Sequence, residues 1–425
     1  MGIFALVLFG AHLVLTVRTG FVQRLLFRAE PGQTRDGGAG VSSAQALAAQ
    51  LAACLGTGNL VGISTAVALG GPGAVVWCWL AGVLGMATRY AESYLGVRYR
   101  QPLPGGGYRG GAAVLLERQG LPLAGRLFSL ALVCGSLLTG AVLQSQAVVL
   151  AAAGLRRCTR PALAAVALTL LAAPPVLAGT RGAVRLCQRL VPFMAGLYLL
   201  ALAALLWQWR DTLPAALCAM LRGAVGLRAA GGGVSAAALA AAVRYGVSRG
   251  LFSNEAGLGT APVLDAQVPG ADPHRQALVS MSGVFWDTVV VCGLTGLAVV
   301  TAGLRMPAAL TLAGPEGLTR MAFAAGLPGG AAVFAAALTC FAYTSVVGCS
   351  VFCVTGAREL WGKASERPVR LAYLTAAALA PLIPAAAAWR AAELCSCAMA
   401  LPNLLAVMRS LAGLRPGSEI RSSTG

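Results

Sequence analysis

The chain has 425 residues, of which 58% are hydrophobic and only 11% are charged, and its mean hydropathy is +0.76. This composition excludes an ordinary water-soluble globular protein and indicates an all-α polytopic membrane protein. The net charge of +18 would suggest nucleic-acid binding in a soluble domain. Here the arginines lie at the ends of apolar segments, where they set membrane topology, so we expect a lipid bilayer and no nucleic acid as partner.

Apolar windows predict about eleven transmembrane helices, since a span needs roughly 20 residues. The first covers residues 2–17, and the others follow at 45–69, 73–97, 127–153, 161–179, 190–210, 238–265, 278–302, 333–358, 368–388 and 392–412. After the first helix the spans divide into two sets of five, and each set begins with an interrupted segment. We therefore predict an N-terminal transmembrane helix and cytoplasmic loop (1–44), a first five-helix repeat (45–231), a second five-helix repeat (232–412) and a cytoplasmic tail (413–425).

The distribution of arginine and lysine predicts the orientation. If the loop at 18–44 is cytoplasmic, that side of the membrane carries 21 of the 32 basic residues and the opposite side carries nine. The positive-inside rule then places the N-terminus outside and the C-terminus in the cytoplasm. The apolar start lacks the charged n-region and cleavage pattern of a signal peptide. We expect a multi-pass protein of the cell inner (plasma) membrane.

The first interrupted segment contains residues 56–59, Gly-Thr-Gly-Asn. Backbone leaves the helical ladder at membrane depth only where protein or a water-filled cavity satisfies its polar groups. A nucleotide-binding loop is rejected, because it would need a strand and a helix around the glycines in a soluble domain. Helix packing explains Gly58 and Gly62, but it does not explain Thr57 and Asn59. The exposed N–H groups of Thr57 and Gly58 suit a carboxylate, and free carbonyls suit a hard cation.

The second interrupted segment is the run at 249–262, Arg-Gly-Leu-Phe-Ser-Asn-Glu-Ala-Gly-Leu-Gly-Thr-Ala-Pro. Its glycines and proline weaken a helix. Loosened carbonyls near Phe252 and Ser253 would receive an ammonium group, and Asn254 offers both a donor and an acceptor. Because the glycines of both breaks leave room for only a small side chain, we predict a small zwitterion as ligand.

The acids within predicted spans include Glu92, Glu255 and Asp287. Glu255 and Asp287 are either functional or structural, since a buried carboxylate is a candidate for either role. Glu92 is flanked by Arg89 and Arg98, which favours a solvated or paired charge at the membrane interface.

Other polar residues have alternative interpretations. Gln144 either bonds across helices or faces a central cavity, and the hydroxyls of Thr344 and Ser345 either bond their own helix or reach a site. The twelve cysteines are scattered through apolar runs, which is typical of packing residues and not of a metal site or a disulfide framework.

Several stretches carry a resemblance to a known family: residues 56–59, 68–74 (Ala-Leu-Gly-Gly-Pro-Gly-Ala), 85–92 (Gly-Met-Ala-Thr-Arg-Tyr-Ala-Glu), 249–262 and 401–404 (Leu-Pro-Asn-Leu). They resemble the signatures of the alanine or glycine:cation (sodium) symporter family, over nearly the whole chain. The resemblance implies a leucine-transporter-type fold, in which one N-terminal helix precedes a 5+5 inverted repeat with interrupted core helices 1 and 6. It also implies sodium-driven uptake of a small neutral amino acid, alanine or glycine.

The resemblance implies a set of site residues. Sodium would be a co-transported ligand, with no cofactor and no catalytic residue. Its implied ligands are the carbonyls of Ala52 and Leu55 and the hydroxyls of Thr344 and Ser345, with Asn59 as a weaker candidate. The expected substrate-binding residues are Thr57, Gly58, Gln144, Phe252, Ser253 and Asn254.

The chain departs from the family at residues 349–354, where Cys-Ser-Val-Phe-Cys-Val replaces the usual Trp-Ser-Tyr-Tyr-Gly-Glu. The lost aromatic and acidic residues leave other substrates open. The alternatives are a proton-coupled or other small-metabolite carrier, and a non-transporting binding or sensor paralogue. An enzyme is not expected, because the chain has only two histidines and no His-Glu-x-x-His motif.

Overall fold

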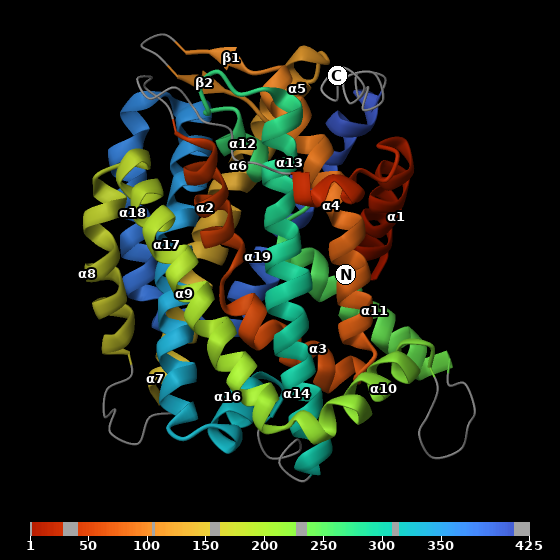
Figure 1. Cartoon of the computed structure of the whole chain (residues 1–425). Helices are drawn as coiled ribbons and strands as arrows, with labels where there is room; N and C mark the ends of the chain where they lie inside the picture. Colours follow the sequence, from red (N-terminus) through yellow and green to blue (C-terminus); the bar gives the residue numbers. More distant parts are fainter. Residues whose placement is uncertain are drawn as a thin grey trace.

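The computed structural model describes residues 2–28, 41–103, 107–153, 162–226, 236–307 and 314–411. Most of these residues are helical, and the longer helices run side by side as one bundle (Figure 1). The predicted boundary between the repeats at 231 and 232 and the predicted tail at 413–425 lie outside the described residues.

The first half of the chain supplies one set of elements. Its α-helices are α1 (Gly2–Arg18), α2 (Ser43–Cys54), α3 (Ile63–Gly70), α4 (Ala74–Arg98), α5 (Ala112–Arg118), α6 (Pro122–Ser136), α7 (Leu143–Ala153), α8 (Leu163–Leu177), α9 (Thr180–Gln208) and α10 (Leu213–Ala224). Short 3-10 helices are η1 (Val22–Arg28) and η4 (Arg210–Thr212). Two segments are π-helical, η2 (Gly58–Gly62) and η3 (Leu137–Val142).

The second half supplies the remaining elements. Its α-helices are α11 (Ala236–Asn254), α12 (Ala261–Asp265), α13 (Pro273–Val284), α14 (Gly293–Arg305), α16 (Gly314–Gly326), α17 (Gly330–Trp361), α18 (Glu366–Leu379) and α19 (Ala385–Arg409). A π-helical segment, η5 (Phe285–Cys292), joins α13 to α14. The 3-10 helices η6 (Lys363–Ser365) and η7 (Ala380–Leu382) flank α18.

Among the described residues, six helices are long and apolar enough to cross a membrane, and eight segments qualify if each of two bent pairs counts as one span. The bent pairs are α1 with η1 and α2 with η2–α3. The three other predicted spans coincide with shorter helices, namely α8, the interrupted pair α11 and α12, and α18 with η7. Each of the eleven predicted spans therefore coincides with helical structure. The number of helices that span the bilayer stays a prediction.

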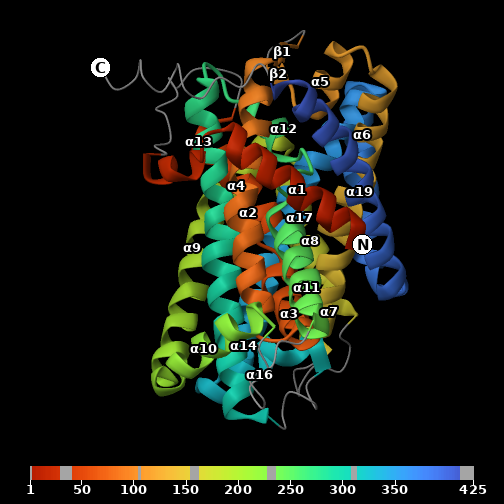
Figure 2. The same ribbon diagram turned by 90° about the vertical axis from the view of Figure 1, so that its right-hand side faces the viewer.

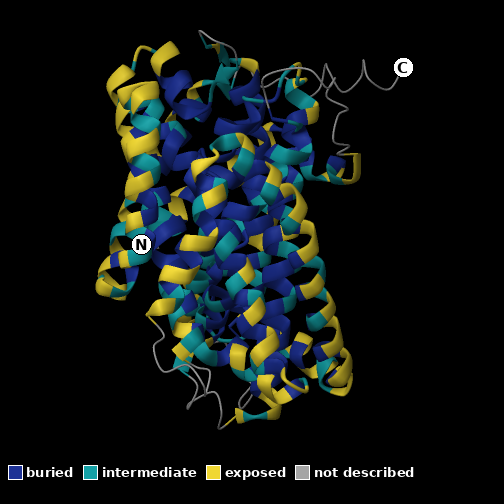
Figure 3. Cartoon of the chain, turned by 90° about the vertical axis from the view of Figure 1, so that its left-hand side faces the viewer, coloured by how far each residue is buried: buried dark blue, intermediate teal, exposed yellow. Residues whose placement is uncertain are grey.

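The outer surface of the bundle is apolar. Buried residues fill the centre and exposed residues follow the outside of the helices (Figure 3). Leu170 and Leu171 of α8 and Phe193 and Leu200 of α9 have 64–69% of their surface exposed. An apolar surface of this extent is typical of a protein whose solvent is lipid.

The segment at 101–111 forms more regular structure than its glycines predict. The strands β1 (Gln101–Pro102) and β2 (Tyr108–Arg109) pair antiparallel, with Gln101 opposite Arg109. The glycines and prolines of this stretch favour an irregular loop, but these four residues form a short hairpin. The hairpin and α5 lie at one end of the bundle, and α10, α14 and α16 lie toward the other end (Figure 2).

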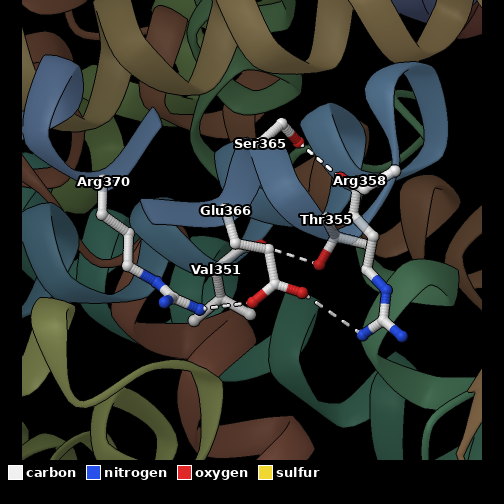
Figure 4. Close-up of polar contacts among 7 residues, drawn as sticks. Val351, Thr355, Arg358, Ser365, Glu366 and Arg370 are labelled. Carbon is white, nitrogen blue, oxygen red and sulfur yellow. Dashed lines mark hydrogen bonds and ion pairs between the residues drawn. The ribbon is translucent and has the colours of Figure 1, made fainter. Parts of the chain in front are cut away.

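Ion pairs fix the hairpin end of the bundle. Arg109 of β2 pairs with Glu359 near the end of α17, with 3.2 Å between nitrogen and oxygen. Across the turn between α17 and α18, Glu366 pairs with Arg358 at 3.5 Å, and within α18 it pairs with Arg370 at 2.8 Å (Figure 4). The Arg358–Glu366 pair joins the two helices on either side of the turn.

Candidate functional site

The first break separates α2 from α3. A capping box begins α2, in which the Ser42 hydroxyl accepts from the Gln45 N–H at 3.2 Å and the Gln45 side chain accepts from the Ser42 N–H at 3.0 Å. The helix ends at Cys54, and Leu55 leaves the helical conformation with φ −72° and ψ 73°. The helix axis turns by 47° across the break. The break predicted at residues 56–59 is therefore present.

The second break follows α11. Glu255, Gly257 and Gly259 have φ angles of 54°, 92° and 77°, which L-residues with side chains rarely adopt. A Cβ on Gly257 would lie 2.4 Å from Leu8 Cδ1, and one on Gly259 would lie 2.7 Å from Asn403 Oδ1. Glycine is required at both positions by conformation and by space.

Local side-chain bonds hold this irregular backbone. Asn254 Oδ1 accepts from the Ala256 N–H at 2.9 Å, and the Thr260 hydroxyl donates to Glu255 Oε2 at 2.8 Å. These contacts replace bonds that a continuous helix would supply. Glu255 thus has a structural contact and also borders the space between the breaks.

A cavity of about 80 Å³ lies between the two breaks and is called the central cavity below. Its walls come from the first break, η3 and α7, the second break and the first half of α19. The lining residues are Ala53, Cys54, Gly56, Thr57, Gly58, Thr139, Leu143, Gln144, Arg249, Phe252, Ser253, Glu255, Leu258, Trp389, Ala392, Glu393 and Ser396. Pockets for drug-sized ligands occupy roughly 300–1,000 Å³, so this cavity suits a much smaller molecule.

Five of the six expected substrate-binding residues line the central cavity, namely Thr57, Gly58, Gln144, Phe252 and Ser253. Asn254 does not line it, and its side chain bonds the backbone of the second break. No atom lies within 4 Å of the point where a Cβ on Gly58 would stand. The cavity is therefore open at this glycine.

Gln144 bridges η3 and the first break. Its Oε1 accepts from the Thr57 N–H at 3.2 Å, and its Nε2 donates to the Thr139 carbonyl at 3.0 Å. A Cβ on Gly56 would lie 2.9 Å from Gln144 Nε2, so Gly56 allows the amide to approach. The π-helical segment η3 precedes Gln144, and such segments are frequent at functional sites.

The expected sodium ligands lie between the first break and α17. The Ser345 hydroxyl donates to the carbonyl of Ala52 at 2.8 Å and to that of Leu55 at 3.3 Å. Three of the four implied oxygens are therefore adjacent. The Thr344 hydroxyl donates to the carbonyls of Phe341 and Cys340 in its own helix, at 3.0 and 3.2 Å.

Asn59 belongs to a second buried polar cluster. Its Nδ2 donates to Asp287 Oδ1 at 2.7 Å, while Asp287 Oδ2 accepts from the hydroxyls of Ser253 and Thr288, each at 2.8 Å. Asn59 Oδ1 has no hydrogen-bond partner. The carboxylate of Asp287 thus ties the first break, the second break and η5 together, so it has a structural role in this conformation.

Glu92 was predicted to be a solvated or paired charge at the membrane interface, and the solvated alternative was wrong. Glu92 is 1% exposed, and its Oε1 accepts from the side-chain amide of Asn403. Arg89 is 2% exposed, and its guanidinium donates to the carbonyl of Asn254. The sequence places both residues near the end of a span, but α12 and α19 pack over them and exclude solvent.

Residues of α19 were missed by the sequence analysis. Trp389, Ala392, Glu393 and Ser396 line the central cavity, and the guanidinium of Arg249 stacks 5.4 Å from the centre of the Trp389 ring. The available signal was an acidic residue, Glu393, at the start of an apolar window. Glu393 is the second residue of that predicted span, and a charge at the end of a span does not by itself indicate a site.

The family model described as the sodium:alanine symporter family matches residues 1–413. The chain belongs to the sodium:alanine symporter family. The "Sodium/alanine symporter AgcS" of Methanococcus maripaludis is 35% identical to this symporter over 415 residues, covering 94% of this chain and 90% of the relative. The "Amino-acid carrier protein AlsT" of Bacillus subtilis is 30% identical over 413 residues, covering 94% and 85%.

A solved structure is similar to this symporter in fold. A Na⁺-coupled sialic acid symporter in a substrate-bound outward-open state has a TM-score of 0.54 and 14% identity, covering 98% of this chain and 84% of that one. At this identity the likeness shows the fold alone, which is the leucine-transporter-type fold that the resemblance implied. The protein is a multi-pass membrane transporter and not an enzyme. The run at 246–250 matches the Gly-x-Ser-x-Gly pattern of hydrolases, but it lies inside α11 and not at a strand-to-helix turn.

Proposed function

We propose that this symporter couples the entry of sodium to the uptake of a small neutral amino acid, alanine or glycine. The observation that carries the proposal is a cavity of about 80 Å³ between two helix breaks, open at Gly58. The cavity's volume and the absence of a side chain at Gly58 favour a ligand with a very short side chain. The polar backbone of both breaks favours a zwitterion.

The amino acid lies with its carboxylate against the first break, in the open space beside Gly58. The positive end of the dipole of the helical segment that follows favours an anion there. Because Gln144 already accepts from the Thr57 N–H, Gln144 fixes the shape of the break, and its amide can rearrange when a carboxylate competes for that N–H. Asn254 acts indirectly, by holding the backbone of the second break.

The ammonium group lies toward the second break. The carbonyls at Phe252 and Ser253 belong to the last turn of α11, which carries the negative end of its helix dipole. The carboxylate of Glu255 also borders the cavity and adds a negative charge on that side. The two ends of the zwitterion thus have different and complementary surroundings.

Sodium binds where the carbonyls of Ala52 and Leu55 meet the hydroxyls of Thr344 and Ser345. Carbonyl and hydroxyl oxygens suit a hard cation, and the Ser345 hydroxyl is already adjacent to both carbonyls. Thr344 joins the site by turning its hydroxyl away from its own helix. Asn59, whose Oδ1 has no partner, is a weaker cation ligand near Asp287.

Coupling follows from the position of both ligands on one break. Leu55 offers its carbonyl to the cation, while residues 56–58 form the wall of the amino-acid cavity. When one ligand fixes this backbone, the second ligand binds with a more favourable free energy. By linkage, each ligand raises the affinity for the other by the same factor. The protein lies in the cell inner membrane with its N-terminus outside, and with its C-terminus and the hairpin end of the bundle in the cytoplasm.

The departure at residues 349–354 does not change the proposed substrate. The central cavity has no lining residue from α17, all of which is described. Cys349 lies behind the wall, beside Gly140 and the lining residue Thr139.

The test is uptake of radiolabelled alanine and glycine into proteoliposomes at fixed pH, with sodium outside or with choline in its place. Sodium-dependent accumulation above the equilibrium level supports the proposal. Accumulation that persists in choline and follows a pH gradient would instead identify a proton-coupled carrier. Sodium-dependent binding without accumulation would identify a binding or sensor paralogue.

A further inference from the structure

Arg89 of α4 is a buried cation with unused donors. It is 2% exposed, and one terminal nitrogen donates to the Asn254 carbonyl and lies 3.9 Å from Cys54 Sγ. Its Nε and its other terminal nitrogen have no hydrogen-bond partner. No described carboxylate forms an ion pair with it. Glu92 and Glu255 are near enough to offset part of its charge, but a buried guanidinium keeps a cost for each donor that stays unbonded, so these donors are available to a ligand.

Glu92 is an equally buried anion on the same face of α4. It is 1% exposed, and its Oε1 accepts from Asn403 Nδ2. The backbone N–H groups of Gly257 and Gly259 face the carboxylate, but Oε2 has no hydrogen-bond partner of good geometry. Residues three apart on a helix are neighbours on its surface. Arg89 and Glu92 therefore place unused donors and an unused acceptor side by side.

The two residues lie next to the central cavity, on the side of the hairpin. Cys54 and Glu255 line the cavity, and Arg89 contacts Cys54 and the carbonyl that precedes Glu255. Arg89 is nine residues before Arg98, where α4 ends, so it is about 14 Å from that end of the helix at 1.5 Å per residue. The pair is therefore at membrane depth, between the cavity and the hairpin end of the bundle.

The second break covers the pair in this conformation. Asn403 of α19 bonds both Glu92 and the carbonyl of Gly257, at 2.9 Å for the latter. A movement of α12 that separates the break from α4 and α19 would uncover the unused atoms of Arg89 and Glu92. In that movement the second break would open a path from the central cavity to Arg89 and Glu92.

We propose that Arg89 and Glu92 form a second, inner site for the transported amino acid. Arg89 receives the carboxylate through its planar fork of N–H groups, and Glu92 receives the ammonium group. The inference rests on the proposed function and on the proposed cytoplasmic position of the hairpin end. The inner site gives the zwitterion compensating charges after it leaves the central cavity, and it recognises the two groups that all amino acids share.

The test compares the two faces of the membrane. Wild type, Arg89→Gln, Arg89→Lys and Glu92→Gln are reconstituted in oriented proteoliposomes, and the KM of alanine exchange is measured from the outside and from the inside at equal sodium. Arg98→Gln is the matched control, because Arg98 is on the same helix and donates to Tyr94 Oη at 2.7 Å.

We expect Arg89→Gln and Glu92→Gln to raise the inner KM at least tenfold and the outer KM less than twofold, with Arg89→Lys intermediate. If Arg89→Gln does not fold, the same comparison of inner and outer KM is made with Arg89→Lys and Glu92→Gln. An unchanged inner KM, or an equal fall in Vmax at both faces with unchanged KM, would show a purely structural pair and overturn the inference. A wild type without sodium-dependent exchange would instead refute the proposed function, so the two failures are distinguishable.

Discussion

The hydroxyl of Ser345 donates to the carbonyl oxygen of Ala52 across 2.8 Å, and thereby joins the middle of α17 to the last turn of α2. The same hydroxyl reaches the carbonyl of Leu55 at 3.3 Å, directly before the first break. A cation at this point would touch both a long continuous helix and the irregular backbone that lines the central cavity. The geometry thus links ion binding to the shape of the amino-acid site.

Removing the Ser345 hydroxyl should weaken sodium binding. We expect Ser345→Ala to raise the sodium concentration for half-maximal uptake about tenfold, because a hydrogen bond or ligand contact to a charged group contributes about 1.5 kcal/mol. Adding Thr344→Ala should raise it further. The control is Ser350→Ala on the same helix, whose hydroxyl donates to the Val347 carbonyl at 2.6 Å. If both serine variants show the same sodium dependence as wild type, the ion binds elsewhere.

A side chain at Gly58 should block the central cavity. We expect Gly58→Val to abolish alanine uptake while the protein still reaches the membrane, because the side chain would fill the open space beside the first break. The control is Gly196→Val in α9, where a Cβ also meets no atom within 4 Å but which does not line the cavity. Near wild-type uptake by Gly58→Val would show that the carboxylate of the amino acid does not bind at this break.

The carboxylate of Asp287 should contribute strongly to stability. We expect Asp287→Asn to lower the free energy of unfolding by about 1–3 kcal/mol, because the amide must turn one N–H donor toward the groups that now donate to the carboxylate. The measurement is thermal unfolding in detergent. The matched control is Glu366→Gln, which removes two partly exposed ion pairs and should cost less than about 1 kcal/mol. Equal effects of both changes would contradict the assigned role of Asp287.

Substrate should protect the thiol of Cys54, which lines the central cavity. In a variant that keeps only this cysteine, we expect alanine with sodium to slow modification by a small, water-soluble methanethiosulfonate reagent at least fivefold. A variant that keeps only Cys218, an exposed residue of α10 that does not line the cavity, serves as the control. Equal labelling rates with and without alanine would show that the cavity is not where the amino acid binds.

The two breaks were predictable because local chemistry causes them. Gly56 and Gly58 weaken the first helix, and the positive φ angles of Gly257 and Gly259 require glycine at the second. The proposed sodium ligands could be named only through the resemblance, because carbonyl oxygens such as that of Ala52 are present in every residue. The structure brings that oxygen to Ser345, 293 residues away.

Other features depended on packing that no local pattern shows. The π-helical segments η3 and η5 arise inside apolar runs without a distinctive composition. Trp389 reaches the cavity because α19 packs against α6, η3 and α7, and Arg89 is buried because the second break and α19 cover it. A charge near the end of a span has the same sequence pattern whether lipid headgroups or other helices surround it.

The most direct test of the account is the affinity of purified protein for alanine as a function of sodium, measured by calorimetry with choline as the replacement cation. If one break holds both ligands, saturating sodium should lower the Kd of alanine at least tenfold, and saturating alanine should lower the Kd of sodium by the same factor. An alanine affinity that is equal in sodium and in choline would contradict the proposed coupling.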